Sequence, residues 1–261
     1  MMSEKLLVNE VFGPTIQGEG PATGRQCAFI RLAICPLRCR WCDTSYTWAF
    51  TEPLALRHQS RTKYSYDEEV HSMTVDEVID KAITHLAGAK LVILSGGEPL
   101  AQVSPRLQKP DAYPDIDHDP IGVLIYDLYD RGIMTHIETA GIYRPSKFVH
   151  QYVERYTVSP KLHSSGNTIK ARRKIDVLDF FANTPKADFK FVITKPDDFS
   201  EVQYLVNLCD IPRHRVWVMP EGTSWPVLQR GLPMVAEGAI KNGYNISTRL
   251  HVNIWGDKRG V

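Results

Sequence analysis

Apolar, β-prone runs alternate with helical patterns along most of the chain, and this alternation constrains the fold more than any other feature. It favours parallel β/α units, in which each helix returns the chain to the same end of the sheet. In such folds the active site forms at the C-terminal ends of the strands. The expected strands are Ala28–Ile34, Leu91–Leu94, Met134–Ile137, Tyr156–Ser159, Asp188–Ile193, Val216–Met219 and Asn245–Leu250.

The strongest helical pattern covers residues 74–87. Thr74 and Glu77 form a T-x-x-E capping box, in which each side chain bonds the backbone N–H of the other residue. The apolar residues that follow recur at i, i+3, i+4 and i+7 spacing and predict one buried face. They are Val75, Val78, Ile79, Ala82, Ile83 and Leu86. Weaker helical patterns lie near 121–131, 175–183, 198–208 and 226–241.

Cys35, Cys39 and Cys42 form a C-x3-C-x2-C motif directly after the expected strand that ends at Ile34. Three thiolates from one short loop can hold three irons of a [4Fe–4S] cube, which usually takes four cysteine ligands. The absent fourth ligand leaves one iron open to a small molecule. A structural zinc site is the alternative, but it needs four closed ligands, and no histidine lies between Cys35 and His58. A chance spacing is the third possibility.

Composition limits the class of protein. The 261 residues are 43% hydrophobic and 23% charged, which predicts one globular domain, 1–261, with a large core. A net charge of +1 implies neither a nucleic-acid partner nor a polybasic membrane surface. No apolar run approaches about 18 residues, so no membrane span is expected. The odd cysteine count and the absence of a signal-peptide pattern argue against disulfides and for the reducing cytoplasm.

Two polar segments interrupt the alternation, near 51–72 and 102–120. The first carries charges of both signs, and the second carries four prolines and four aspartates. Solvated surface insertions are the favoured interpretation of both. A lid over the site, or a surface for a partner, is the alternative.

A second motif, Ser95-Gly96-Gly97-Glu98-Pro99, follows the next expected strand. Paired glycines permit close approach of the backbone to a ligand, and Glu98 adds a carboxylate for a ligand amine. Together with the cysteine motif, this turn resembles the radical S-adenosylmethionine (SAM) superfamily. The resemblance implies a single-domain, incomplete TIM-like β/α barrel of α/β class. It also implies that the open iron chelates SAM, whose reductive cleavage yields a radical that abstracts hydrogen from substrate.

The flanking sequence resembles one family within this superfamily, the 7-carboxy-7-deazaguanine synthases. The segments that carry the resemblance are 12–20, 29–32, 42–44, 137–141, 158–161, 189–193 and 219–222. This implies conversion of 6-carboxy-5,6,7,8-tetrahydropterin to 7-carboxy-7-deazaguanine with loss of ammonia, a step of queuosine and 7-deazapurine biosynthesis. It further implies a lyase that uses a [4Fe–4S] cluster, SAM and Mg²⁺, an external electron donor of flavodoxin or ferredoxin type, and a homodimer.

The resemblance also assigns individual residues. Arg31 pairs with the pterin carboxylate, because its planar fork matches two oxygens. Thr44 binds Mg²⁺ through its hydroxyl, with a turn cap as the alternative role. Glu138 contacts the pterin as the catalytic carboxylate, with a structural hydrogen bond as the alternative. The remaining substrate residues are Ile16, Gln17, Gly18, Ser95 and His251. The SAM-binding residues are Gly97, Glu98, Ser159, Lys161, Met219, Pro220, Glu221 and Gly222.

Some positions depart from the family pattern. Ala140 stands where the family often has asparagine, and the C-terminal tail differs from the short His-Lys ending of some members. Cys27 and Cys209 match no motif and are expected to be core thiols. A radical SAM activating enzyme, which makes a glycyl radical on a partner protein, is the alternative function. It predicts a peptide-binding groove, whereas a pterin enzyme needs a small closed pocket.

Overall fold

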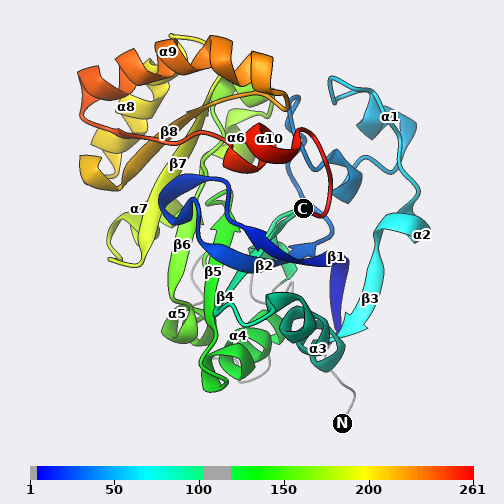
Figure 1. Cartoon of the computed structure of the whole chain (residues 1–261). Coiled ribbons are helices and arrows are strands. Elements are labelled where there is room, and N and C mark those ends of the chain that lie inside the picture. The colour runs from blue at the N-terminus through cyan, green and yellow to red at the C-terminus, as the bar shows by residue number, and fades with distance from the viewer. Residues whose placement is uncertain (1–4, 103–118) are drawn as a thin grey trace.

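The computed structural model describes residues 5–102 and 119–261, which form one mixed sheet curved into an incomplete barrel (Figure 1). Within these residues the sheet has nine strands, in the order β3-β1-β2-β4-β5-β6-β7-β8-β9. The barrel is incomplete because its end strands, β3 and β9, pair with only one neighbour each. The strands are β1 Lys5–Ile16, β2 Gln26–Leu32, β3 His71–Thr74, β4 Leu91–Gly96, β5 Met134–Thr139, β6 Arg155–Val158, β7 Ala187–Ile193, β8 Val216–Pro220 and β9 Asn245–Ile246.

All pairings from β2 to β9 are parallel, whereas β1 runs antiparallel to both β2 and β3. The longer helices cover the outside of the sheet, with α3 on β1 and β2, and α9 on β8. This confirms the α/β class expected from the alternation. The helices are α1 Glu52–Ala55, α2 Tyr66–Glu69, α3 Val75–Leu86, α4 Pro120–Asp130, α5 Lys147–Tyr152, α6 Ile169–Arg172, α7 Ile175–Ala182, α8 Asp198–Leu208, α9 Trp225–Asn242 and α10 Leu250–Trp255.

The two faces of the strands have different environments. On β2, Ala28, Ile30 and Leu32 belong to the large core cluster between sheet and helices. The residues between them on β2 point to the inside of the barrel, where Cys27 and Phe29 pack in a second apolar cluster. Because side chains alternate along a strand, Arg31 faces the inside as well. The inner face therefore changes from apolar to polar toward the C-terminal strand ends.

The predicted helix at 74–87 is confirmed as α3, with its capping box. The Glu77 N–H donates to Thr74 Oγ1 at 3.2 Å, and the Thr74 N–H donates to Glu77 Oε2 at 2.8 Å. The predicted apolar face is buried except for Ile83, whose exposed fraction is 37%. The prediction is wrong for Ile83, because this residue lies at the edge of the apolar stripe, next to the side of the helix that faces solvent.

The predicted strand Asn245–Leu250 is wrong beyond its first two residues. Only Asn245 and Ile246 pair with β8. The Leu250 N–H then donates to the Gly18 carbonyl at 2.9 Å, and this bond draws the chain across the barrel end, where α10 begins. The long strand β1 was not predicted, because Gly13 and Pro14 interrupt its pattern.

The polar segment at 51–72 contains α1, α2 and the start of β3. The segment at 102–120 falls almost entirely outside the described residues. Cys27 and Cys209 are buried, as predicted. In the described part of the chain, no helix is both long and apolar enough to cross a membrane.

Candidate active site

A cavity of about 370 Å³ lies at the C-terminal ends of the parallel strands. The cysteine loop forms one wall, and the C-terminal tail, residues 256–261, lines another side. Two predicted site residues, Glu98 and Pro220, are not among its lining residues. The predicted residues that do line it are Ile16, Gln17, Gly18, Arg31, Cys35, Cys39, Cys42, Thr44, Ser95, Gly97, Glu138, Ser159, Lys161, Met219, Glu221, Gly222 and His251.

The cysteine loop leaves β2 through a sharp turn at Ile34. Its φ is +68°, a conformation that β-branched residues rarely adopt. Two hydrogen bonds hold it: the Ile34 N–H donates to the Thr47 carbonyl at 2.9 Å, and the Glu98 N–H donates to the Ile34 carbonyl at 3.0 Å. Strain of this kind persists where surrounding contacts enforce it, often at functional sites. Here the turn directs all three thiols to the cavity.

Gly97 lets the β4 turn pack directly on this loop. A Cβ at position 97 would lie 2.1 Å from the Ile34 carbonyl oxygen. The Gly97 N–H also donates to the Leu32 carbonyl at 2.8 Å. The glycine turn and the cysteine loop therefore meet backbone to backbone, which places the two sequence motifs on one cavity.

Side-chain N–H groups point at two of the three sulfurs. Asn167 Nδ2 donates to Cys39 Sγ at 3.2 Å, and Trp48 Nε1 donates to Cys42 Sγ at 3.4 Å. Burial raises the pKa of Cys39 to about 12 and also raises the pKa of Cys42. Buried thiols stay protonated without a cation, whereas a coordinating thiol is deprotonated outright. The N–H donors are suited to sulfurs that carry negative charge.

This donor set fits a [4Fe–4S] cluster better than zinc. In the described ranges, no three His, Cys, Asp or Glu side chains are arranged to hold a single metal ion. A four-iron cube separates its ligands more widely, because each thiolate binds a different iron. Cys35, Cys39 and Cys42 line one cavity and would hold three irons of such a cluster, leaving one iron without a protein thiolate and free to bind a small molecule.

Glu98 is 1% exposed and ties the β4 turn to the end of β5. Thr139 Oγ1 and the Ala140 N–H each donate to one of its carboxylate oxygens at 2.7 Å. Burial raises the pKa of Glu98, against the opposing effect of these hydrogen bonds. Its contact with the SAM amine stays a prediction, and in this conformation both oxygens are engaged by protein.

Glu138 joins three segments at the inner face of the barrel. It accepts hydrogen bonds from Ser95 Oγ at 2.5 Å and Gln17 Nε2 at 3.1 Å, and Lys190 Nζ lies 3.6 Å away. Glu138 thus has the structural role, hydrogen bonding within the protein, that was the alternative to contact with the pterin. Because its side chain also lines the cavity and is 19% exposed, the two roles are compatible.

Arg31 lies beside the cavity between aromatic rings. Its Nε pairs with Glu10 Oε1 at 2.7 Å, and its guanidinium lies 5.4 Å from the Phe12 ring and 5.8 Å from the Tyr46 ring. Among the described residues, no protein acceptor contacts its Nη nitrogens. That edge can therefore receive a carboxylate from a ligand.

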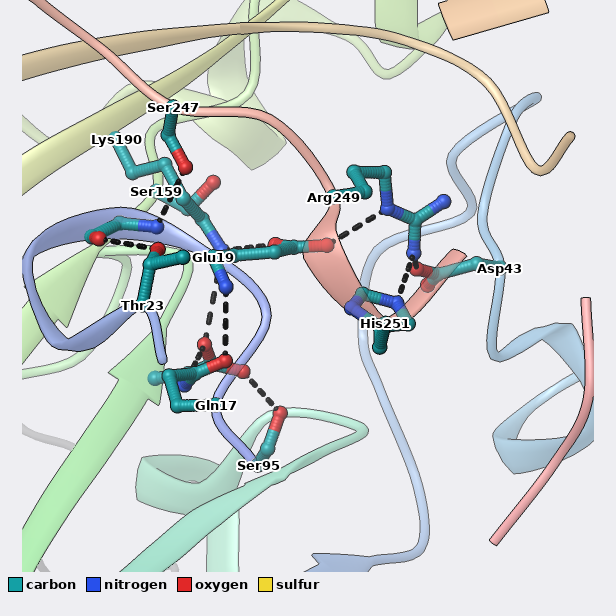
Figure 2. Close-up of polar contacts among 12 residues, drawn as sticks. Gln17, Glu19, Thr23, Asp43, Ser95, Ser159, Lys190, Ser247, Arg249 and His251 are labelled. Carbon is teal, nitrogen blue, oxygen red and sulfur yellow. Dashed lines mark hydrogen bonds and ion pairs between the residues drawn. The ribbon is translucent and has the colours of Figure 1, made fainter. Parts of the chain in front are cut away.

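A network of charges, buried except for the partly exposed Asp43, crosses the site (Figure 2). Glu19 pairs with Lys190 through one carboxylate oxygen and with Arg249 Nε at 2.7 Å through the other. Arg249 also pairs with Asp43. Burial alone would raise the pKa of Glu19, but Lys190 and Arg249 hold it well below its usual range. Burial would lower the pKa of Lys190, but Glu19 and Glu138 raise it overall.

The sequence alone predicted no role for the four charged residues of this network, Glu19, Asp43, Lys190 and Arg249. Lys190 offered a signal, because it is a lone charge inside the apolar run Phe189–Ile193. Arg31, which the resemblance assigned, has the same feature, since it is a lone charge in the expected strand Ala28–Ile34. Nothing in the local sequence indicated that Arg249 would return to Glu19, because the two residues lie far apart in the chain.

His251 reaches the cavity by packing on the turn at Gly18. A Cβ at Gly18 would lie 2.0 Å from His251 Nδ1, so only glycine fits there. Burial lowers the pKa of His251, in spite of the charge of Glu19. The imidazole is therefore neutral at pH 7 and can accept as well as donate a hydrogen bond.

Comparisons with known proteins agree with this geometry. The family model of the radical SAM superfamily matches residues 29–177. The chain is 34% identical over 256 residues to a 7-carboxy-7-deazaguanine synthase from Pyrobaculum aerophilum, a match that covers 98% of this chain and 97% of that protein. A second protein of that name, from Hyperthermus butylicus, is 31% identical over 251 residues, covering 95% and 92%.

The fold has a counterpart among solved structures. The crystal structure of QueE from Escherichia coli superposes with a TM-score of 0.66 and 24% identity, covering 95% of both chains. At this level of identity the likeness establishes the fold, the incomplete β/α barrel.

Proposed function

The chain belongs to the 7-carboxy-7-deazaguanine synthase family of the radical SAM superfamily, and we propose that it converts 6-carboxy-5,6,7,8-tetrahydropterin to 7-carboxy-7-deazaguanine with loss of ammonia. The observation that carries this proposal is the convergence of the three cysteines with Arg31 and Glu138 on one cavity. A [4Fe–4S] cluster and SAM, when bound, supply the hydrogen-abstracting radical chemistry of the superfamily.

Cys35, Cys39 and Cys42 would hold the cluster, and SAM would lie across the adjacent strand ends. Ser159 and Lys161 line the cavity on that side, with Lys161 Nζ donating to Ser159 Oγ at 2.9 Å. The Lys161 ammonium supports this placement, because it offers positive charge beside the cysteine loop for a carboxylate ligand.

The pterin would lie between Arg31 and Glu138. Arg31 pairs with the substrate carboxylate through its Nη edge, and Glu138 accepts hydrogen bonds from pterin N–H groups. Ser95, Gln17 and Lys190 hold Glu138 in position before substrate arrives. Such preorganisation matters because a group that is already oriented loses little freedom on binding.

We place Mg²⁺ at the Thr44 hydroxyl. Thr44 lines the cavity, and its Oγ1 lies 3.5 Å from Cys42 Sγ. The alternative role, a turn cap, is weakened because the side chain makes no capping hydrogen bond to the 3-10 turn at Ser45–Thr47. Mg²⁺ takes few oxygen ligands from protein and completes its shell with water and substrate.

A Mg²⁺ titration of turnover tests this placement in the wild type, Thr44→Ala and Thr44→Ser. We expect Mg²⁺ to stimulate the wild type and Thr44→Ser, which keeps the oxygen, and to stimulate Thr44→Ala much less. Cluster content should stay unchanged in all three proteins. Identical titration curves for the wild type and Thr44→Ala would remove the metal role.

Three further proposals rest on family membership. An external flavodoxin- or ferredoxin-type protein would reduce the cluster, and two copies of the chain would form a homodimer. The five free cysteines support a reducing compartment such as the cytoplasm. Sedimentation velocity tests the dimer, and turnover with each donor protein compared with dithionite tests the electron source.

Anaerobic turnover tests the function as a whole. The reconstituted protein, given the tetrahydropterin, SAM, Mg²⁺ and a reductant, should form 7-carboxy-7-deazaguanine, detected by mass spectrometry. SAM should be regenerated and remain unconsumed. Consumption of SAM with the pterin left intact would instead favour the activating-enzyme alternative, which the small, tail-lined cavity does not support.

A further inference from the structure

The C-terminal tail, residues 256–261, is attached to the rest of the protein through Arg259. Its Nη1 and Nη2 donate to the two carboxylate oxygens of Glu69 at 3.0 and 2.8 Å. Nη2 also donates to Asn9 Oδ1 at 3.0 Å, and Nε lies 3.2 Å from Glu10 Oε2. The guanidinium covers the Tyr46 ring at 4.0 Å. This two-bond geometry fixes orientation as well as distance.

The receiving carboxylate is itself held in place. Asn9 Nδ2 donates to Glu69 Oε2 at 2.7 Å and to the Glu69 carbonyl at 2.8 Å. Glu69 is the last residue of α2, in the polar segment 51–72, and its side chain is 13% exposed. Figure 1 shows the C-terminus between this segment and β1. The segment thus offers a prepared docking point for the tail, which a merely solvated insertion would lack.

The docking point is connected to the predicted substrate arginine. Glu10 contacts Arg259 through Oε2 and Arg31 through Oε1, and both cations lie over the ring of Tyr46. The tail also lines the cavity at Gly256, Asp257, Lys258, Arg259, Gly260 and Val261. A ligand that fills the cavity therefore meets the docked tail.

We propose that Arg259 and Glu69 form a latch that closes the C-terminal tail over the bound substrate, and that segment 51–72 is the surface that receives it. Only the identity of the ligand rests on the proposed function. If the ligand contacts the closed tail, ligand binding and closure stabilise each other by the same factor. Arg259 is on this account a positioning residue, because it acts through the tail.

Digestion by carboxypeptidase Y, followed by intact mass spectrometry, measures tail opening without any turnover. Glu69→Gln removes the charge that binds Arg259, and we expect Val261 to be released about three- to tenfold faster than in the wild type, as for a partly exposed charged pair. Arg259→Ala should behave in the same way. The matched control is Glu68→Gln on the same helix, since Glu68 is exposed and makes no ion pair among the described residues. Equal rates in the wild type and both latch variants would overturn the latch.

The same assay with the tetrahydropterin present tests closure over substrate. We expect the pterin to slow release of Val261 in the wild type and Glu68→Gln. Glu69→Gln should bind the pterin more weakly only in proportion to the fall in the closed fraction of the tail, with SAM affinity unchanged. Equal rates of Val261 release with and without the pterin in the wild type, under conditions where the pterin binds, would overturn closure over substrate. A pterin that binds none of these proteins, while the digestion rates still differ, would leave the latch standing and refute the proposed substrate.

Discussion

The cysteine loop and the buried charge network lie on the same cavity but are built in opposite ways. The loop brings its three thiols from eight consecutive residues, 35–42. The network draws Glu19, Asp43, Lys190 and Arg249 from four distant segments. A site whose groups share one segment leaves a spacing in the sequence. A site assembled across a barrel leaves only isolated charges.

The two regions also differ in whether their polar groups already have partners. The thiols are buried or half-buried, and burial raises their pKa values in spite of the nearby cations Arg38 and Lys161, so their chemistry awaits a bound cluster. The network is complete, because each of its buried charges already has a partner. Changes in the loop should therefore abolish chemistry and spare the fold, whereas changes in the network should destabilise the fold itself.

The largest expected effect tests the loop. Cys39→Ala should abolish both the iron–sulfur absorbance and turnover, because one iron loses its thiolate. The matched control, Cys209→Ala, alters a thiol that is also buried but lies in the core away from the cavity, and it should keep both signals. Iron content after anaerobic reconstitution is the measurement. A full cluster in Cys39→Ala would show that the ligand assignment is wrong.

The second prediction tests the network. Arg249→Met removes the cation that the largely buried Glu19 shares with the partly exposed Asp43, and it should lower the free energy of unfolding by about 3 kcal/mol. Urea denaturation of the apoprotein measures the loss. Lys63→Met is the control, because its pair with Glu52 is exposed and contributes about 0–1 kcal/mol. Similar losses in the two variants would mean that the network is no more than a surface ion pair.

The third prediction separates binding from folding at the border of the two regions. Arg31→Ala should weaken pterin binding about 10- to 100-fold, as expected for loss of a charge-assisted pair. SAM affinity and cluster content should not change. Glu10, which loses Arg31 as a partner, still pairs with Arg259 and is not left as an unpaired charge. Calorimetry with each ligand checks this. Equal losses for both ligands would indicate collapse of β2.

The smallest effect concerns His136, on the inner face of the barrel. Burial, with Arg25 and Arg155 nearby, lowers its pKa to about 4, and in the described residues its Nε2 has no hydrogen-bond partner. The folded state thus keeps His136 neutral, while the unfolded chain takes up a proton below its ordinary value of about 6.5. Stability is therefore full above pH 6.5 and decreases as the pH falls toward 4.

At pH 5 this loss should be about 2 kcal/mol for the wild type relative to pH 7. His136→Gln should flatten that part of the stability curve, since glutamine does not titrate. Urea denaturation at both pH values makes the comparison. An unchanged slope in the variant would assign the pH dependence to other groups.

Much of the fold could be predicted, because local patterns and core burial agree. The capping box at Thr74 and the stripe Val75 to Leu86 produced α3 as expected. The strand expected at Asn245–Leu250 failed because Arg249 leaves the sheet to pair with Glu19. Glu98 was expected at the cavity, but its oxygens bond to Thr139 and Ala140 instead.

The sequence by itself determined the chemistry that one segment can carry: three thiols in one loop, a glycine turn after the next strand, and an arginine in an apolar strand. Those features depend on spacing of a few residues and on side-chain alternation. Only the tertiary structure decided which distant charges neutralise one another and where the C-terminal tail docks. Pairing across the barrel depends on Coulomb attraction in a buried site, which acts through space and leaves no periodicity in the chain.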